Sequence, residues 1–102
     1  MGMPGVNNSA GAVRLRGFLR CLSRDDVELV RRHLPEHLRL TREEPGCISF
    51  EVSETDDPLI WRVEELFADR AAFDFHQRRT RASEWFMATS AIPRDYEITT
   101  LE

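Results

Sequence analysis

His76 is the residue whose type and position are best suited to chemistry. Asp69 can cap a helix, and Ala72, Phe73 and His76 follow it at spacings of three and four that place them on one helical face. A face with this composition is expected to lie against the rest of the protein. An imidazole there can act as a general base near neutral pH. The alternative is a core histidine that hydrogen-bonds a carbonyl group.

Glu65 is the second candidate for a catalytic role. It falls in a predicted strand, residues 59–67, on the face that also carries Leu59, Trp61, Val63 and Phe67. A carboxylate among large apolar side chains is costly unless it has a partner. We therefore expect Glu65 to orient the ring of His76 or to bind a substrate hydroxyl, because carboxylate–imidazole pairing fixes the histidine tautomer. A salt bridge with one of the arginines is the alternative.

Aromatic side chains are numerous in the second half of the chain and could line a flat pocket. Ligand sites are mostly apolar with a few polar groups, so such a pocket suits a small aromatic substrate, although each ring could equally be core filling. We predict substrate contacts for Trp61, Phe73, Trp85 and Tyr96, from a set that also includes Phe75 and Phe86.

Two other groups of residues have weaker signals. His33 and His37 have the spacing of a helical metal pair, but Pro35 lies between them and the motif is not that of a zinc protease. We expect these two histidines to be exposed, and we predict no metal site. Cys47 follows a glycine with no base nearby in sequence, so we expect a small buried hydrophobic residue rather than a nucleophile.

Composition excludes several classes of function. All 14 basic residues are arginine, and the chain has no lysine amine for a Schiff base, a pyridoxal-phosphate site, a phosphate loop or a protein kinase. A net charge of −4 without a basic cluster argues against nucleic-acid binding. The longest apolar runs fall well short of the ~20 residues of a membrane span, so no membrane is expected.

The N-terminal residues and the cysteines suggest a cellular location. Residues 1–11 are rich in Gly, Asn and Ser, which predicts a flexible tail ahead of a single domain at residues 12–102. The tail has neither the basic start nor the apolar run of a signal peptide. We therefore expect a cytoplasmic protein in which Cys21 and Cys47 are reduced.

Period-two and period-3.6 patterns alternate along the domain. A strand is predicted from Ala12, with Val13, Leu15, Gly17, Leu19 and Cys21 on one face. Ser23 can cap a helix whose buried stripe is Val27, Val30, Leu34 and Leu38. Pro35 interrupts that stripe and predicts a kink or a close pair of helices.

The second half of the domain repeats this alternation. Residues 47–53 predict a strand with Ile48, Phe50 and Val52 on one side, and a turn at residues 55–58 predicts a hairpin with residues 59–67. The helix capped by Asp69 is followed by a helical segment at residues 81–90. A last strand is predicted at residues 92–100, with Ile92, Tyr96 and Ile98 together.

The resulting order, β-α-β-β-α-β, predicts a ferredoxin-like α+β fold with a four-stranded antiparallel sheet and helices on one face. The other sheet face is left uncovered, with Phe18, Ile48 or its neighbours and charged residues on it. A mixed face of this kind suits a partner sheet, so we predict a symmetric homodimer.

Several of these residues together resemble the antibiotic biosynthesis monooxygenase family, over nearly all of residues 13–100. The resemblance rests on the run EPGCISFE at residues 44–51, the pattern Glu65-x-Phe67-x-Asp69-x-x-Ala72-Phe73-x-x-His76, and Arg94-Asp95-Tyr96. It implies a dimeric α+β barrel with a pocket between sheet and helices in each subunit. Members include cofactor-independent oxygenases of aromatic polyketides and quinols, haem-degrading enzymes and an isomerase of signalling molecules.

The resemblance also implies roles for individual residues. Glu65 and His76 match the family's acidic and histidine positions, and Trp61, Phe67 and Trp85 fall on pocket or core positions. The haem-degrading branch has an asparagine on the first strand and a late histidine, and this chain has neither, so no haem is expected.

The activity that follows is a cofactor-free monooxygenase acting on a small aromatic or quinol-like substrate with O₂. His76 would be the base, Glu65 its orienting partner, and Tyr96 or an arginine a donor to the developing oxyanion. The alternatives are a dimeric binding module without catalysis, and an isomerase or lyase that uses the same base on an activated ketone.

Overall fold

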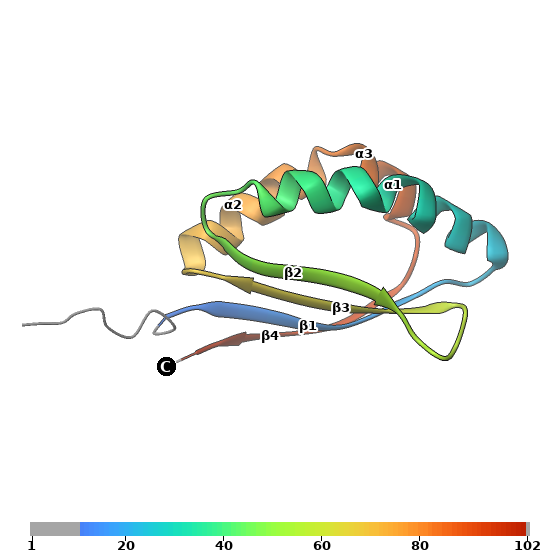
Figure 1. Ribbon diagram of the computed structural model, residues 1–102, viewed down its shortest axis with the longest axis horizontal. Coiled ribbons are helices and arrows are strands. Elements are labelled where there is room, and N and C mark those ends of the chain that lie inside the picture. Colours follow the sequence, from blue (N-terminus) through green and yellow to red (C-terminus); the bar gives the residue numbers. More distant parts are fainter. Residues whose placement is uncertain (1–10, 102) are drawn as a thin grey trace, which may run out of the picture.

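Four strands form one antiparallel sheet in the order β2-β3-β1-β4 in the computed structural model, which describes residues 11–101. The elements follow the order β1 (Val13–Arg20), α1 (Arg24–Arg42), β2 (Cys47–Glu54), β3 (Ile60–Phe67), α2 (Arg70–Arg81), α3 (Glu84–Thr89) and β4 (Arg94–Thr100). All three helices lie over the same face of the sheet, and the opposite face carries none (Figure 1). The predicted ferredoxin-like fold is confirmed.

The two central strands hold the core. β1 pairs with β3 so that Val13 lies opposite Phe67 and Leu19 lies opposite Trp61, and all four side chains are buried. Alternation along β3 buries Trp61, Val63, Glu65 and Phe67 on the helix-covered face, as the sequence predicts. The predicted N-terminal tail lies outside the described residues except for Gly11, whose N–H donates to the carbonyl of Leu101 at 2.8 Å.

The first helix is longer and more regular than predicted. Ser23 caps α1 by accepting a hydrogen bond from the N–H of Asp26, and Val27, Val30 and Leu34 are buried. The helix continues without a break through Pro35, so the expected helix pair is wrong. The proline removes one backbone donor, but the apolar stripe packs on the sheet both before and after it, which keeps the helix in one piece.

The strand that follows departs from simple alternation. The β2–β3 register shifts between Cys47 and Ser49, which is the mark of a β-bulge at Ile48. Phe50 is buried, whereas Ile48 is about half exposed. The prediction that Ile48 lies on the same side of the strand as Phe50 is therefore wrong, because the extra residue turns its side chain outward.

The last elements are shorter than predicted. Arg81 ends α2, and Ser83 caps a separate helix, α3, by accepting a hydrogen bond from the N–H of Phe86, so the helical segment expected at residues 81–90 begins later. Similarly, β4 begins at Arg94 instead of Ile92. Ile98 is about half exposed although it shares a strand face with Tyr96.

Candidate functional site

His76 lies at the centre of a buried polar cluster between α2 and the sheet. Asp69 caps α2 through the N–H of Ala72, and the face that the sequence predicted then turns His76 inward, with 2% of the residue exposed. The rings of Phe67 and Phe50 lie 4.8 and 5.7 Å from the imidazole, measured between centroids. Burial lowers the pKa of His76, and the neighbouring Glu44 carboxylate opposes that shift.

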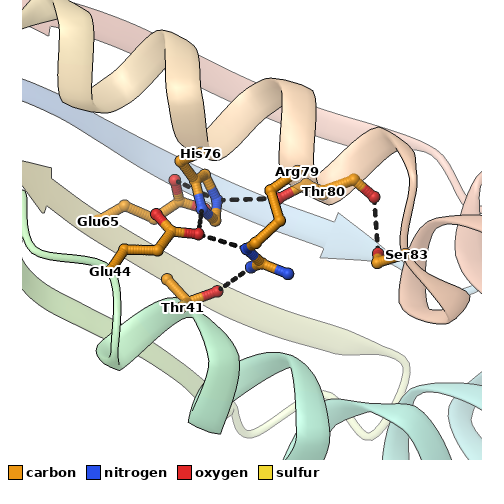
Figure 2. Close-up of polar contacts among 7 residues, drawn as sticks. All are labelled: Thr41, Glu44, Glu65, His76, Arg79, Thr80 and Ser83. Carbon is orange, nitrogen blue, oxygen red and sulfur yellow. Dashed lines mark hydrogen bonds and ion pairs between the residues drawn. The ribbon is translucent and has the colours of Figure 1, made fainter.

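Glu44 is the nearest acidic partner of His76. Its Oε2 lies 3.2 Å from Nδ1 of His76, and Arg79 donates from Nε to the same oxygen (Figure 2). Arg79 also donates from an η nitrogen to Oγ1 of Thr41 at 2.9 Å, so Thr41 and Arg79 together hold the carboxylate in place. A carboxylate only accepts hydrogen bonds, so this contact favours the tautomer with hydrogen on Nδ1 and the lone pair on Nε2.

A close contact between backbone segments allows Glu44 to reach the histidine. Glu44 lies in the turn between α1 and β2, and Gly46 in the same turn packs directly against α2. A Cβ atom on Gly46 would lie 2.2 Å from the Cβ of Ala72, which is far inside contact distance. Only glycine therefore lets the turn sit this close to the helix that carries His76.

The other ring nitrogen of His76 faces Thr80 and Glu65. Nε2 lies 3.3 Å from Oγ1 of Thr80 and 3.8 Å from Oε1 of Glu65, as Figure 2 shows. Burial, and next the nearby charge of Glu44, raise the pKa of Glu65 to about 8, although Arg94 opposes the shift. At neutral pH Glu65 is therefore mostly a protonated acid, which can donate a hydrogen bond.

A cavity of about 220 Å³ opens beside these residues, between the sheet and the C-terminal half of α2. Its walls are mainly apolar and aromatic. It is lined by Leu15, His37, Phe50, Val52, Val63, Glu65, His76, Gln77, Thr80, Arg81, Trp85, Phe86, Arg94 and Tyr96. Burial raises the pKa of Tyr96 to about 12, so its hydroxyl stays protonated and can donate.

The aromatic residues predicted to bind substrate divide into two groups. Trp85 and Tyr96 line the cavity, as does Phe86. Trp61 and Phe73 are buried in the hydrophobic core and do not line it. Phe75 is about half exposed. The structure thus brings together His76, Glu65, Trp85 and Tyr96 around the cavity, whereas Trp61 and Phe73 pack in the hydrophobic core.

His37 belongs to the cavity, and the expectation that it is exposed is wrong. Only 4% of the residue is exposed, and its ring stacks on Trp85 with centroids 4.8 Å apart and planes 2° from parallel. Burial lowers its pKa to about 3, so the ring is neutral at working pH, and its Nδ1 has no hydrogen-bond partner among the described residues. His33 is only partly buried and lies outside the cavity lining.

His33 and His37 have the spacing of a helical metal pair, but no metal site is predicted for them. Within residues 11–101, no three His, Cys, Asp or Glu side chains converge in a way that could hold a metal ion. Cys47 is partly buried, and burial raises the pKa of its thiol, which does not favour the thiolate that a nucleophile needs.

Four polar members of the site were missed from sequence: Thr41, Glu44, Arg79 and Thr80. Glu44 lies in a turn and has no periodic signal, whereas Thr41 continues the buried stripe of α1 at helical spacing. His37 did have a signal, because it continues the buried stripe of Val30 and Leu34 at helical spacing.

The fold and the site together define a ferredoxin-like α+β protein with a histidine–carboxylate cluster on a small ring-lined cavity. A family profile described as antibiotic biosynthesis monooxygenase matches residues 14–87. The chain belongs to the antibiotic biosynthesis monooxygenase family.

Solved structures of similar fold extend across almost the whole chain. A conserved protein of Methanosarcina mazei Go1 superposes with a TM-score of 0.77 at 23% identity, covering 90% of this chain and 94% of its own. A protein of Nitrosomonas europaea that provisionally carries the same family name has a TM-score of 0.76 at 17% identity, covering 93% and 94%. At these identities the likeness bears on the fold alone. No curated protein sequence matches significantly.

Not one of the helices in residues 11–101 combines the length and the apolar composition that crossing a membrane requires.

Proposed function

We propose that the protein is a cofactor-independent monooxygenase that oxidises a small aromatic or quinol-like substrate with O₂. The observation that carries this proposal is the arrangement around His76. Oε2 of Glu44 lies 3.2 Å from Nδ1 of His76. The other nitrogen, Nε2, is therefore the one that can act as a base toward the buried, ring-lined cavity. Membership of the monooxygenase family supports the same class of reaction.

In the proposed reaction, Nε2 of His76 removes a hydroxyl proton from the bound substrate. The Glu44 carboxylate stabilises the imidazolium that forms, because it lies against the opposite nitrogen. Glu65 therefore has a different role from the one expected: as a protonated acid 3.8 Å from Nε2, it donates to the substrate oxyanion or to the peroxide. Tyr96, protonated and on the cavity wall, is a second donor.

The electrons of this reaction come from the substrate. An electron-rich phenolate passes one electron to triplet O₂, and the two radicals recombine to form a carbon–oxygen bond. Cleavage of the O–O bond then leaves one oxygen atom on the ring and releases the other as water. A hydroquinone thus becomes a hydroxyquinone, with no other reductant required. The apolar walls keep bulk water away from the reactive anion.

Oxygen uptake by the metal-free protein with methylhydroquinone tests this proposal. His76→Ala should lower the rate roughly 10²- to 10⁴-fold, the range expected for a lost general base. His33→Ala, on a helix surface outside the cavity lining, is the matched control and should keep the wild-type rate. Unchanged uptake in the His76 variant would remove this residue from the mechanism.

The two alternatives give different results in the same assay. An isomerase or lyase would convert an activated ketone at the same rate without oxygen. A binding module would bind the aromatic probe without consuming it. Either outcome would replace the monooxygenase proposal, while the cavity would remain the site of binding.

We also propose that the helix-free face of the sheet pairs with that of a second copy, as the sequence predicted. The face is self-complementary, because arginine and acidic side chains alternate across it. The arginines are Arg14, Arg16, Arg20 and Arg62, and the acids are Glu51, Glu64, Asp95 and Glu97. Phe18 lies among them, with the guanidinium carbons of Arg20 and Arg62 at 5.5 and 5.4 Å from its ring centroid. Sedimentation equilibrium should give a dimer for the wild type and a monomer for Phe18→Asp.

A further inference from the structure

The cavity is cationic in a protein whose net charge is −4. Arg81 and Arg94 both line it, and Glu65 is the only carboxyl group in the lining. Burial raises the pKa of Glu65 to about 8, which opposes its ionisation at neutral pH, and an imidazole carries no negative charge in either protonation state. The lining therefore offers the two arginines no strong counter-charge.

Arg94 forms no salt bridge within residues 11–101, although Glu65 is near enough for Arg94 to lower the pKa of its carboxyl group. Its guanidinium donates to the carbonyl of Thr89 at 2.7 Å, to the carbonyl of Ile92 at 2.9 Å and to Oγ1 of Thr89 at 2.9 Å, all of them neutral oxygens. Arg81 forms no salt bridge within the same described range, and it is the one exposed residue in the lining, which places it at the cavity mouth. A partly buried cation without a counter-ion is unfavourable, so an anion from outside would be stabilised here.

The backbone positions of the two arginines are displaced from the catalytic cluster, whereas the Arg94 side chain reaches back far enough to act on Glu65 and Tyr96. The sheet register places Glu65 level with Leu15 and Ile98, whereas Arg94 is four positions along β4, which is about 13 Å of strand. Arg81 follows His76 by five positions, about 7.5 Å along α2. Because β1 and α2 run in the same direction across the molecule (Figure 1), both displacements point the same way.

We propose that the natural ligand is an aromatic carboxylate that binds lengthwise in the cavity. Its carboxylate lies between Arg81 and Arg94, its ring against Trp85 and Phe50, and its hydroxyl at Nε2 of His76. This proposal rests on the proposed function, because it assumes that the cavity is the substrate site. The volume of about 220 Å³ suits a single substituted ring, since a cavity of about 150 Å³ holds benzene.

The test compares two probes of nearly equal shape, 2,5-dihydroxybenzoate and 2,5-dihydroxybenzamide, by calorimetric titration at pH 7. The wild type should bind the acid at least roughly tenfold more tightly than the amide, as expected for a charge-assisted contact. Arg81→Gln should bring the two affinities to within about threefold, and Arg81→Glu should reverse the preference. Arg94→Lys, which keeps the charge but loses the fork of donors, should weaken acid binding while leaving amide binding nearly unchanged.

Arg78→Gln provides the matched control. Arg78 is exposed on the same helix but does not line the cavity, so its variant should keep the wild-type preference for the acid. Equal affinities for acid and amide in the wild type would overturn the proposal. An equal effect of Arg78→Gln and Arg81→Gln would also overturn it. That result would mean that the electrostatic field of the whole protein, and not a specific binding site, attracts the acid.

The outcome can be separated from that of the proposed function. Turnover of neutral methylhydroquinone without any preference for the acid would overturn the carboxylate proposal and leave the oxygenase proposal standing. Failure of all three probes to bind would overturn both, because the cavity would then not be the substrate site.

Discussion

Nδ1 of His76 and Oε2 of Glu44 lie 3.2 Å apart, although 32 positions separate the two residues in the chain. Arg79 donates from Nε to the same Oε2, and Thr41 in turn accepts a hydrogen bond from Arg79. In a buried setting this contact has two consequences: it selects the tautomer of the imidazole, and it partly restores the basicity that burial removes.

Replacing Glu44 with glutamine should impair catalysis and change its pH dependence. The substitution removes the negative charge that supports the imidazolium, so we expect kcat/KM for oxygen uptake to fall roughly 10²-fold or more. The pKa of His76 should drop further below its ordinary value, because the Glu44 carboxylate now raises it. The acidic limb of the pH–rate profile should therefore move to lower pH. Glu43→Gln, an exposed neighbour, should leave the profile unchanged.

Gly46→Ala should disturb the site through packing alone. The added methyl group would lie 2.2 Å from the Cβ of Ala72, so the turn must move away from α2 and carry Glu44 with it. We expect a loss of about 1 to 3 kcal/mol in the free energy of unfolding, together with lower activity. The double variant Gly46→Ala, Ala72→Gly removes the clash and should recover much of the activity, since glycine in a helix costs only about 1 kcal/mol. An equally inactive double variant would show that the contact does not position Glu44.

Glu65→Gln should change how stability depends on pH. The pKa of Glu65 in the folded protein is about 8, against an ordinary value of 4.5 for a glutamate side chain. Between these values the unfolded chain releases the proton while the folded protein keeps it, so the stability of the wild type falls by about 1.4 kcal/mol per pH unit from this group. Glutamine cannot titrate. Chemical denaturation at pH 5 and pH 8 should therefore show that the free energy of unfolding of the variant increases relative to that of the wild type as pH rises. The same change with pH in both proteins would contradict the shifted pKa.

His37→Phe should make the protein less sensitive to acid. Burial holds the pKa of His37 at about 3, below the ordinary value of 6.5 for histidine, so the unfolded chain takes up the proton first as pH falls. Stability is lost progressively below about pH 6.5, and at pH 4.5 this group should account for about 2 to 3 kcal/mol. Phenylalanine keeps a ring against Trp85 but cannot be protonated. The measurement is denaturation at pH 7.5 and 4.5, with His33→Phe as the control for adding an aromatic ring to the same helix.

Much of the fold follows from local patterns. The alternation along residues 59–67 correctly places Glu65 on the interior face, and the spacing after Asp69 does the same for His76. Where the pattern was interrupted, prediction failed. Ile48 is turned outward by a bulge. His37 was expected to be exposed because Pro35 interrupts the helical pattern, but it continues the buried stripe of α1.

The sequence by itself determined the order of the elements and which side chains face the interior, because strand and helix periods are local properties of the chain. Only the tertiary structure decided which interior groups meet. It brought Glu44 to Nδ1 of His76, set Glu65 at 3.8 Å from the other nitrogen, and placed Arg81 and Arg94 in the lining of the same cavity. Such distances depend on how a turn packs against a distant helix, as Gly46 does against Ala72, and no period along the chain encodes that contact.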